Sequence, residues 1–204
     1  MTRKEIPRRM SRDWSALEGQ LERQSSWLKE SWHWLLDTKV LQDSKKGRTR
    51  PAALDVGCGP GIVAEALNDR LDSTGIDIDA EMVRAFRGRG MEAVLSDAAH
   101  LPFNDDSFDV VFCSFLLLWV RDARAVLREM RRVSRRWVLC LAEPDIEGRI
   151  DYPLELSELT RLAAEGVRRE GGDPSIGRKL RALLNECGLR GEVECIQACG
   201  ALRG

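Results

Sequence analysis

The 204-residue sequence lacks the cysteine and histidine patterns of metal-binding proteins. None of its six cysteines forms a Cys-X-X-Cys pair, and neither of its two histidines joins a cysteine at zinc spacing. Several cysteines lie inside apolar runs, as buried thiols do. The pattern therefore predicts no metal site and a reducing compartment, which we take to be the cytoplasm.

Long apolar runs and an excess of charge are absent too. The longest nearly uncharged apolar stretch, Val110 to Val120, is too short to cross a bilayer. No apolar segment follows the basic residues near the N-terminus, so we expect no secretory signal. Lys and Arg (32) nearly balance Asp and Glu (33), which offers no general attraction to nucleic acid or to anionic membranes. The sequence thus predicts a globular protein with neither a membrane nor a nucleic-acid partner.

What the sequence does contain is an alternation of short apolar runs with amphipathic segments. We expect strands at residues 52–56, 74–78, 92–95, 109–114 and 137–142. We expect helices at residues 62–71, 80–89, 123–133, 154–169 and 176–187, the last closed by Gly188. This rhythm is typical of an α/β fold with a Rossmann-like, doubly wound and mostly parallel sheet, which we assign to residues 51–204.

A separate helical pattern precedes this domain. From Ser11 to Leu41, apolar residues recur at three- and four-residue steps with charged residues between them. We interpret residues 1–50 as a helical lid on the domain. The segment carries four tryptophans: Trp14, Trp27, Trp32 and Trp34. They could line an apolar binding site, but packing of the helix explains them slightly better.

The strongest local signal is the turn Leu54-Asp55-Val56-Gly57-Cys58-Gly59-Pro60-Gly61. Its three glycines let the backbone come close to a ligand, because no Cβ intervenes and a positive φ costs little. The helix that follows offers free amides at its N-terminus. Ile62 stands where the third glycine of a dinucleotide-binding fingerprint would be, which counts against NAD. The strand-end carboxylate of Asp55 favours a binding role over a purely structural turn.

Residues 54–61 resemble motif I of the class I S-adenosylmethionine-dependent methyltransferases. Gly75-Ile76-Asp77-Ile78-Asp79 is similar to the second-strand motif of the same family, whose acidic residue accepts hydrogen bonds from both ribose hydroxyls. The resemblance implies that Asp77 binds the ribose and that Ile78 packs against adenine.

Two later segments extend the likeness. Ser96-Asp97-Ala98 resembles the stretch that holds the adenine amino group, which implies this role for Asp97, with the Ala98 backbone beside the ring. Residues 110–115 resemble the segment beneath the methionine moiety, which places Ser114 there. The cofactor contacts that the resemblance implies are Asp55, Gly57, Cys58, Gly59, Gly61, Asp77, Ile78, Asp97, Ala98 and Ser114.

The likeness covers roughly residues 52–143 and is nearest to small-molecule methyltransferases of the kind that act in quinone biosynthesis. It implies S-adenosylmethionine as the cofactor and in-line SN2 transfer of its methyl group to a small-molecule acceptor. Such a displacement mainly needs donor and acceptor held in line, so no catalytic residue is assigned and the acceptor atom stays open. A cofactor-binding or partner-binding protein without turnover is the alternative.

Two segments depart from that family. Ser134-Arg135-Arg136 stands in place of its glycine-rich turn before the fifth strand. After the last expected helix only one candidate strand, Glu192 to Ala198, precedes Gly204, whereas the sheet of the family has a sixth and an antiparallel seventh strand. We therefore expect six or fewer strands and an incomplete C-terminal part of the sheet. Either a homodimer covers the exposed edge, or this sequence ends before the native terminus.

Six further side chains could serve the site: His33, His100, Glu143, Asp145, Arg149 and Tyr152. The first histidine could be a general base or an incidental residue of its helix, and the second more simply fills a loop. The two carboxylates after the fifth strand could orient a nucleophile or cap a loop. The arginine and the tyrosine belong to an insertion beyond that strand and could contact an acidic or aromatic acceptor.

Overall fold

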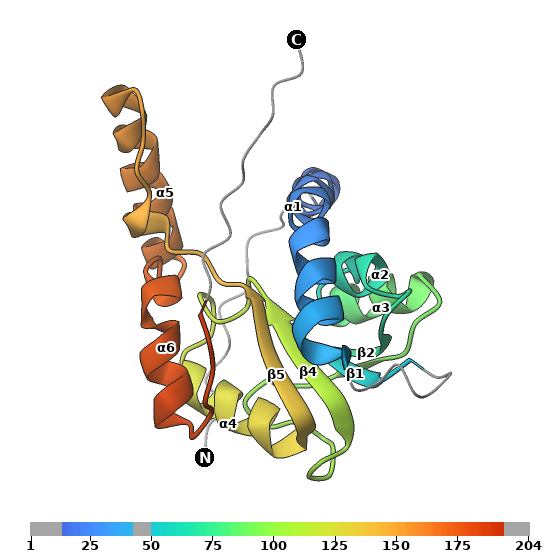
Figure 1. Ribbon diagram of the computed structural model, residues 1–204. Coiled ribbons are helices and arrows are strands. Elements are labelled where there is room, and N and C mark those ends of the chain that lie inside the picture. Colours follow the sequence, from blue (N-terminus) through green and yellow to red (C-terminus); the bar gives the residue numbers. More distant parts are fainter. Residues whose placement is uncertain (1–13, 43–49, 194–204) are drawn as a thin grey trace, which may run out of the picture.

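The computed structural model describes residues 14–42 and 50–193, which are built around one sheet (Figure 1). The strands of this sheet are β1 (Ala52–Val56), β2 (Asp72–Asp77), β3 (Ala93–Leu95), β4 (Phe108–Ser114) and β5 (Ser134–Ala142). All neighbouring strands are parallel, in the order β3-β2-β1-β4-β5. The predicted Rossmann-like α/β fold is confirmed.

The strand order changes direction between β1 and β4. From β1 the chain continues to β2 and β3 on one side, and it then crosses back to form β4 and β5 on the other. Val56 of β1 pairs with Ile76 of β2 and with Cys113 of β4, so these strands end at nearly the same level. In open α/β sheets, ligands bind beyond the carboxyl ends of the strands at such a switch point. This edge of the sheet is therefore where a site is expected.

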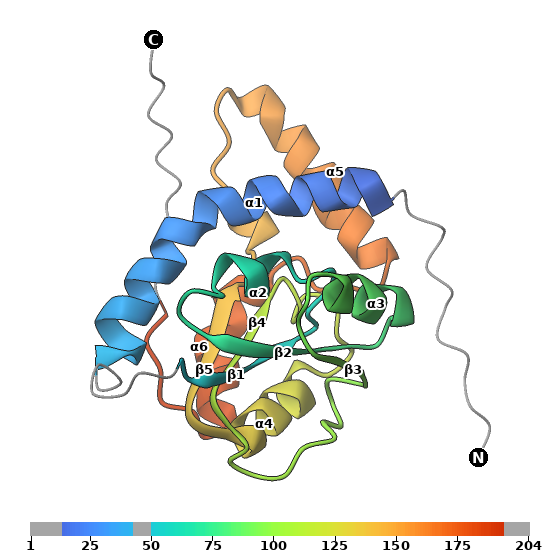
Figure 2. The ribbon, with the colours of Figure 1, turned by 90° about the vertical axis from the view of Figure 1, so that its right-hand side faces the viewer.

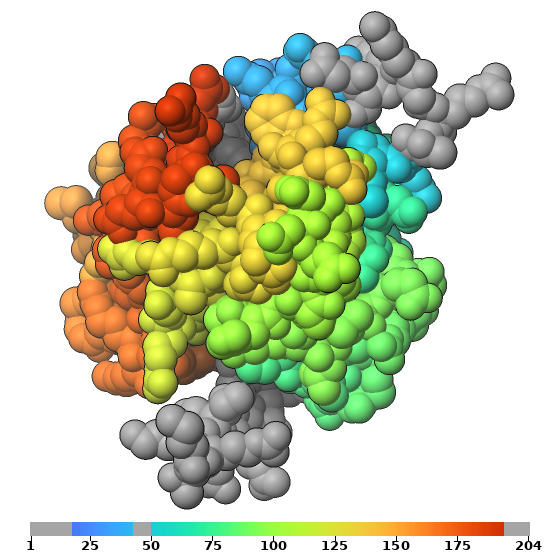
Figure 3. Space-filling model, turned by 90° about the horizontal axis from the view of Figure 1, so that it is seen from below, coloured from blue at the N-terminus to red at the C-terminus, as the bar shows by residue number. Residues whose placement is uncertain are grey.

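Helices cover both faces of the sheet (Figures 1 and 2). One face carries α1 (Trp14–Leu35) with its π-helical continuation η1 (Leu36–Val40), α2 (Ile62–Ala66) and α3 (Ala80–Gly88). The other carries α4 (Ala123–Val133) and α6 (Ile176–Glu186), which pack against each other and are neighbours in the view from below (Figure 3). The arrangement produces one hydrophobic core on each side of the sheet.

The central strands are apolar along most of their length because both of their faces are covered. In β4, Val111 and Cys113 belong to the core beneath α4 and α6. Val110 and Phe112 belong to the opposite core, beneath α1, α2 and α3. All four side chains are buried. The continuous apolar run that the sequence shows here is thus the signature of a two-sided strand.

Side-chain caps set where α3 and α4 begin. Asp79 accepts a hydrogen bond from the Glu81 amide at 2.8 Å. Asp122 accepts from the amides of Arg124 at 2.9 Å and Ala125 at 3.1 Å. These bonds satisfy donors that the first turn of a helix leaves free. α3 and α4 therefore begin at the predicted residues. α2 also begins where predicted, at Ile62, but it ends at Ala66 and is shorter than predicted.

The second half of the N-terminal helix belongs to the core. Trp32 is 1% exposed, and its Nε1 donates a hydrogen bond to the Leu141 carbonyl of β5 at 3.1 Å. Leu36 and Val40 of η1 are buried in the same cluster. The predicted helix is confirmed as a helix. Its role as a lid stays a prediction, and it can apply only to the part before Trp32.

The start of β5 differs from the prediction. Phe108 of β4 pairs with Ser134, and Val110 pairs with Trp137, so β5 has one extra residue over this stretch. Such a bulge keeps the chain in the sheet while it bends. β5 therefore begins at Ser134, three residues before the predicted strand, because residues 134–136 continue directly from α4 into the sheet.

Beyond β5, two 3₁₀ turns, η3 (Ile146–Gly148) and η4 (Leu154–Leu156), lead into α5 (Ser157–Arg169). This helix rises above the sheet on the side of α6, whereas α1 rises on the side of α2 (Figure 1). Residues 192 and 193 have no regular structure, and the rest of the predicted strand Glu192 to Ala198 lies outside the described residues. No helix in the described part of the chain is long and apolar enough to cross a membrane.

Candidate functional site

The glycine-rich turn after β1 is held against the end of β2. The Cys58 amide donates a hydrogen bond to the Ile76 carbonyl at 2.8 Å. Gly57, Gly59 and Gly61 have φ angles of 71°, 52° and 90°. Residues with a Cβ adopt this left-handed region at a cost of about 1–2 kcal/mol each, which explains why three glycines stand here.

The three glycines have different surroundings. A Cβ on Gly57 would lie 2.6 Å from the Leu116 side chain, and one on Gly61 would lie 2.8 Å from the Phe86 ring, so both positions are closed by packing. A Cβ on Gly59 would meet nothing within 4 Å. Gly59 is therefore the glycine of this turn that faces space a ligand can fill.

Asp77 links this turn to the end of β2. Its Oδ2 accepts a hydrogen bond from the Gly59 amide and its Oδ1 accepts one from the Asp79 amide, both at 2.9 Å. Burial raises the pKa of Asp77 above its ordinary value, although both amides favour the carboxylate. Each oxygen has a further lone pair, so the group can still accept from two neighbouring hydroxyls of a ligand.

The residues expected on the adenine side lie at the same edge of the sheet. Ile78 is 57% exposed, although it is a large apolar side chain. The Ser96 amide donates to the Asp77 carbonyl at 2.9 Å, which brings the next residue, Asp97, beside the end of β2. Asp97 is exposed and accepts the amide two residues further on at 2.9 Å, while Ala98 packs against the core. The structure thus gathers the residues of the second and third motifs next to the turn.

Two other residues of the expected site carry buried polar atoms without a partner among the described residues. These atoms are Oδ2 of Asp55 in β1 and Oγ of Ser114 at the end of β4. Burial, and to a smaller extent the charge of Asp77, raises the pKa of Asp55 well above its ordinary value. Buried polar groups nearly always have a hydrogen-bond partner, so unpartnered atoms at strand ends fit a site whose ligand brings its own donors.

Replacing Asp55 with asparagine is expected to stabilise the ligand-free protein near pH 8. Because the pKa of Asp55 is raised in the folded state, folding favours its protonated form, and stability falls as pH rises from the unfolded pKa through the folded pKa. The amide has the same shape and does not ionise. Urea denaturation should therefore show a stability gain for Asp55→Asn that is larger at pH 8 than at pH 4.

The control for this experiment is Asp72→Asn, an exposed carboxylate at the other end of the neighbouring strand β2. Its effect on the free energy of unfolding should stay within about 0.5 kcal/mol at both pH values, as for other surface substitutions. A gain for Asp55→Asn that is no larger at pH 8 than at pH 4 would contradict the prediction.

The sequence left two roles open for Glu143, just beyond β5: to orient a nucleophile or to cap a loop. Its contacts are those of a loop cap. Its Oε1 accepts the Leu116 amide and its Oε2 accepts the Leu117 amide, both at 3.0 Å. Burial raises the pKa of Glu143 to about 7, although these amides favour the carboxylate. Leu116, which no sequence motif singled out, is the residue whose side chain packs against Gly57.

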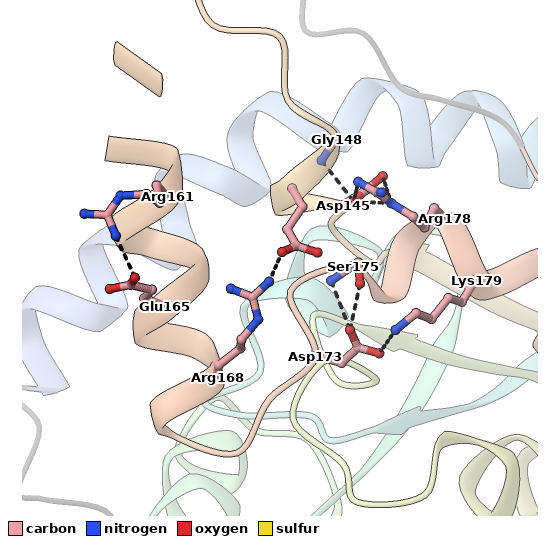
Figure 4. A network of polar contacts seen from close by, with 10 residues as sticks. Asp145, Gly148, Arg161, Glu165, Arg168, Asp173, Ser175, Arg178 and Lys179 are labelled. Atoms are coloured by element: carbon pink, nitrogen blue, oxygen red, sulfur yellow. Dashed lines mark hydrogen bonds and ion pairs between the residues drawn. The ribbon is translucent and has the colours of Figure 1, made fainter. Parts of the chain in front are cut away.

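Asp145 ties the insertion after β5 to α6. It accepts hydrogen bonds from Nε and Nη2 of Arg178, both at 2.8 Å, and from the Gly148 amide at 3.1 Å (Figure 4). Both partners belong to the protein, so the capping role of this carboxylate accounts for its contacts. The hydrogen bonds to Asp145, and to a smaller extent its charge, raise the pKa of Arg178.

A cavity of about 290 Å³ lies between η3 and α5. Its lining residues are Glu147, Arg149, Asp151, Ser157, Thr160, Arg161, Ala164 and Arg168. Each of the three arginines forms an ion pair with a carboxylate; two of them are labelled in Figure 4. Tyr152 is 89% exposed and is not among the lining residues. Of the two residues expected to contact an acceptor, only Arg149 therefore faces a cavity.

The contacts of His33 and His100 are those of an incidental helix residue and of a loop residue. Nε2 of His33 lies 3.0 Å from the Ala66 carbonyl, at the end of α2, so this side chain joins two helices. The side chain of His100 is 86% exposed and lies 3.9 Å from Asp97. Neither arrangement directs an imidazole at the turn after β1.

The tryptophans of α1 do not form one apolar face. Trp32 is buried in the core, whereas Trp27 is 72% exposed and Trp34 is 51% exposed. The side chain of Trp14 lies outside the described residues. At 3.6 residues per turn Trp34 lies on nearly the same side of the helix as Trp27, whereas Trp32 is turned about 140° away from Trp27 and faces β5.

Comparisons with known proteins agree with the sequence motifs. Residues 54–140 match the family model described as a methyltransferase domain. A demethylmenaquinone methyltransferase of Thermotoga maritima is 39% identical over 88 residues, covering 41% of this chain and 38% of that protein. The mitochondrial arginine-hydroxylase NDUFAF5 of Danio rerio is 36% identical over 129 residues, covering 61% of this chain and 39% of that protein. The chain thus spans less than half the length of these two relatives.

The fold is also found among solved structures. The crystal structure of a SAM-dependent methyltransferase from Thermotoga maritima matches with a TM-score of 0.53 and 21% identity, covering 82% of this chain and 79% of that chain. At this identity the match shows a shared fold.

Proposed function

Because the chain belongs to the class I S-adenosylmethionine-dependent methyltransferases, we propose that it transfers the methyl group of S-adenosylmethionine to a small-molecule acceptor. One observation carries the proposal: the motif I turn and the second-strand carboxylate meet in a direct hydrogen bond, from Gly59 to Asp77, at the switch point of the sheet. Methyl transfer in this family requires that S-adenosylmethionine is held at this edge of the sheet. The turn offers open space and the carboxylate offers acceptors at the same place.

We assign the parts of the cofactor to residues of this chain as follows. Asp77 accepts from the ribose hydroxyls, Ile78 covers one face of adenine, and Asp97 accepts from the adenine amino group. Asp55 and Ser114 lie on the methionine side, where the cationic amino group supplies a donor for their unpartnered atoms. The exposure of Ile78 and the unpartnered polar atoms support this assignment.

Methyl transfer needs few side chains beyond those that hold the cofactor. When bound, the cofactor supplies a methyl carbon that is already activated by the positive charge of its sulfur. The chain has to hold this carbon in line with the acceptor atom and to exclude water from it. The part of α1 before Trp32 is the proposed lid for this purpose, and Trp27 gives it an exposed aromatic surface.

The acceptor is proposed to be a small molecule of the kind used in quinone biosynthesis, in the cytoplasm. The similarity to demethylmenaquinone methyltransferases over the cofactor-binding region supports this choice. In the described residues β5 pairs on one side only, with β4, and a homodimer that covers its other side belongs to the same proposal.

Two measurements on the wild-type protein test the proposed function. Calorimetry with S-adenosylhomocysteine is expected to show binding, and incubation of an extract with radiolabelled S-adenosylmethionine is expected to label the small-molecule fraction. Binding without any labelling would favour the alternative of a cofactor-binding protein without turnover. Label in the protein fraction would move the acceptor to protein side chains, and an absence of binding would refute the proposal.

A further inference from the structure

Glu143 is a half-buried carboxylate that belongs to none of the cofactor motifs. It follows the last residue of β5, and both of its oxygens are directed at the turn after the neighbouring strand β4. One oxygen accepts the Leu116 amide and the other accepts the Leu117 amide, each at 3.0 Å. Cys113 of β4 also directs its thiol at Oε1, with a sulfur–oxygen distance of 3.6 Å. The side chain therefore joins β5 to the turn after β4.

The turn that Glu143 holds is adjacent to the motif I turn. Phe115 has a φ of 53°, a left-handed conformation that a residue with a bulky side chain adopts only when its surroundings impose it. Its amide donates to the Ala142 carbonyl at 2.7 Å, so backbone and carboxylate together impose this geometry. The side chain of the next residue, Leu116, packs against Gly57, where an added Cβ would lie only 2.6 Å from it. A chain of contacts thus runs from Glu143 to the glycine-rich turn.

Glu143 is itself held from behind by α6. A Cβ on Gly177 would lie 2.7 Å from the Glu143 carbonyl oxygen, and the Gly177 amide donates to the Pro144 carbonyl at 3.2 Å. Asp145 adds its bidentate contact with Arg178, seen in Figure 4. With its backbone fixed in this way, the carboxylate of Glu143 is placed by the fold and does not depend on a ligand.

We propose that Glu143 is a positioning residue of the cofactor site, which holds the turn after β4 against Gly57 in the shape that binds the methionine end of S-adenosylmethionine. This inference rests on the proposed function. Through Glu143, the end of β5 contributes to cofactor binding, although no residue of β5 belongs to a cofactor motif.

The ionised form of Glu143 is the form that holds the turn, because a carboxylate accepts from both amides whereas a protonated carboxyl turns one oxygen into a donor. Its pKa of about 7 places this change in the neutral range. The titratable and charged groups on the elements around it are Cys113, Cys140, Asp145, Asp173, Arg178 and Lys179. Four of these groups pair with each other: Asp145 forms an ion pair with Arg178 at 2.8 Å, and Asp173 forms one with Lys179 at 2.6 Å. Cofactor affinity is therefore expected to fall as pH decreases through about 7.

The test is calorimetry of S-adenosylhomocysteine binding between pH 6 and 8.5 with the full chain. The wild-type protein is expected to bind more tightly above pH 7 than below it. In Glu143→Gln, the side-chain amide faces a backbone donor with its own donor, so affinity at pH 8 should drop by about tenfold, the scale of one lost hydrogen bond to a charged group. The change of affinity with pH should be smaller in this variant than in the wild type, and what remains of it belongs to Asp55 and Asp77, whose pKa values are also raised. In Glu143→Asp, which keeps the charge, a pH step should remain.

The matched control is Glu186→Gln, the same chemical change at an exposed carboxylate that pairs with Arg124 at the end of α6. It should leave both the affinity and the pH step unchanged. Wild-type affinity at pH 8 in Glu143→Gln, or a pH step in it as large as that of the wild type, would overturn the positioning role while leaving the proposed function intact. A wild-type protein that binds no S-adenosylhomocysteine at any pH would overturn both. If Glu143→Gln fails to fold, the loss of the pH step in Glu143→Asp would by itself overturn the proposal.

Discussion

Replacing Asp77 with alanine is expected to raise the dissociation constant of S-adenosylhomocysteine by about 10- to 100-fold, the range for a lost hydrogen bond to a charged group. The carboxylate has two tasks that alanine cannot perform. It is the acceptor assigned to the ribose hydroxyls, and it holds the Gly59 and Asp79 amides at 2.9 Å. Its loss therefore removes a contact with the ligand and loosens the turn around it. Calorimetry at pH 8 measures the change directly.

The matched control for Asp77→Ala lies on the same strand. Asp72, at the other end of β2, has an exposed side chain whose charged partner, Arg50, is 3.9 Å away. Asp72→Ala should leave the dissociation constant unchanged. In Asp77→Asn one oxygen can still accept a hydrogen bond, so an intermediate affinity is expected. An unchanged dissociation constant in Asp77→Ala would rule out the ribose-binding role of Asp77.

Replacing Trp32 with alanine should lower the free energy of unfolding by about 3–5 kcal/mol, the range for removing a large aromatic side chain from a core. Trp32 is 1% exposed, and its Nε1 donates to the Leu141 carbonyl. The substitution would leave a cavity between α1 and β5 and a backbone acceptor without its donor. Urea denaturation followed by circular dichroism gives the change.

The control for Trp32→Ala is Trp27→Ala on the same helix, because the Trp27 side chain is 72% exposed. This change should cost no more than about 0.5 kcal/mol, as for other surface positions. Similar losses in both variants, or a loss below about 1 kcal/mol for Trp32→Ala, would show that α1 is not anchored in the core. In that case the whole of residues 1–50 could serve as a movable lid.

The sequence by itself determined the features that depend on neighbouring residues. The glycines at 57, 59 and 61 predict a turn, because a positive φ angle is tolerated by glycine itself and does not depend on distant residues. The start of α4 depends only on near neighbours too, because the Asp122 cap acts on amides two and three residues away. The apolar run of β4 indicates burial on both faces, and with it a parallel sheet between two layers of helices. These local signals were sufficient for the fold class and for the position of the candidate site.

Only the tertiary structure decided which side chains serve the protein and which remain for a ligand. Glu143 is separated by 27 residues from Leu116, and Trp32 by 109 residues from Leu141, so no local pattern connects them. The bulge that draws residues 134–136 into β5 depends likewise on its pairing with β4. A carboxylate after a strand has the same local signature whether it faces a substrate or a backbone amide. Its environment is set by segments far apart in the chain, because burial and hydrogen-bond partners form only when those segments pack together.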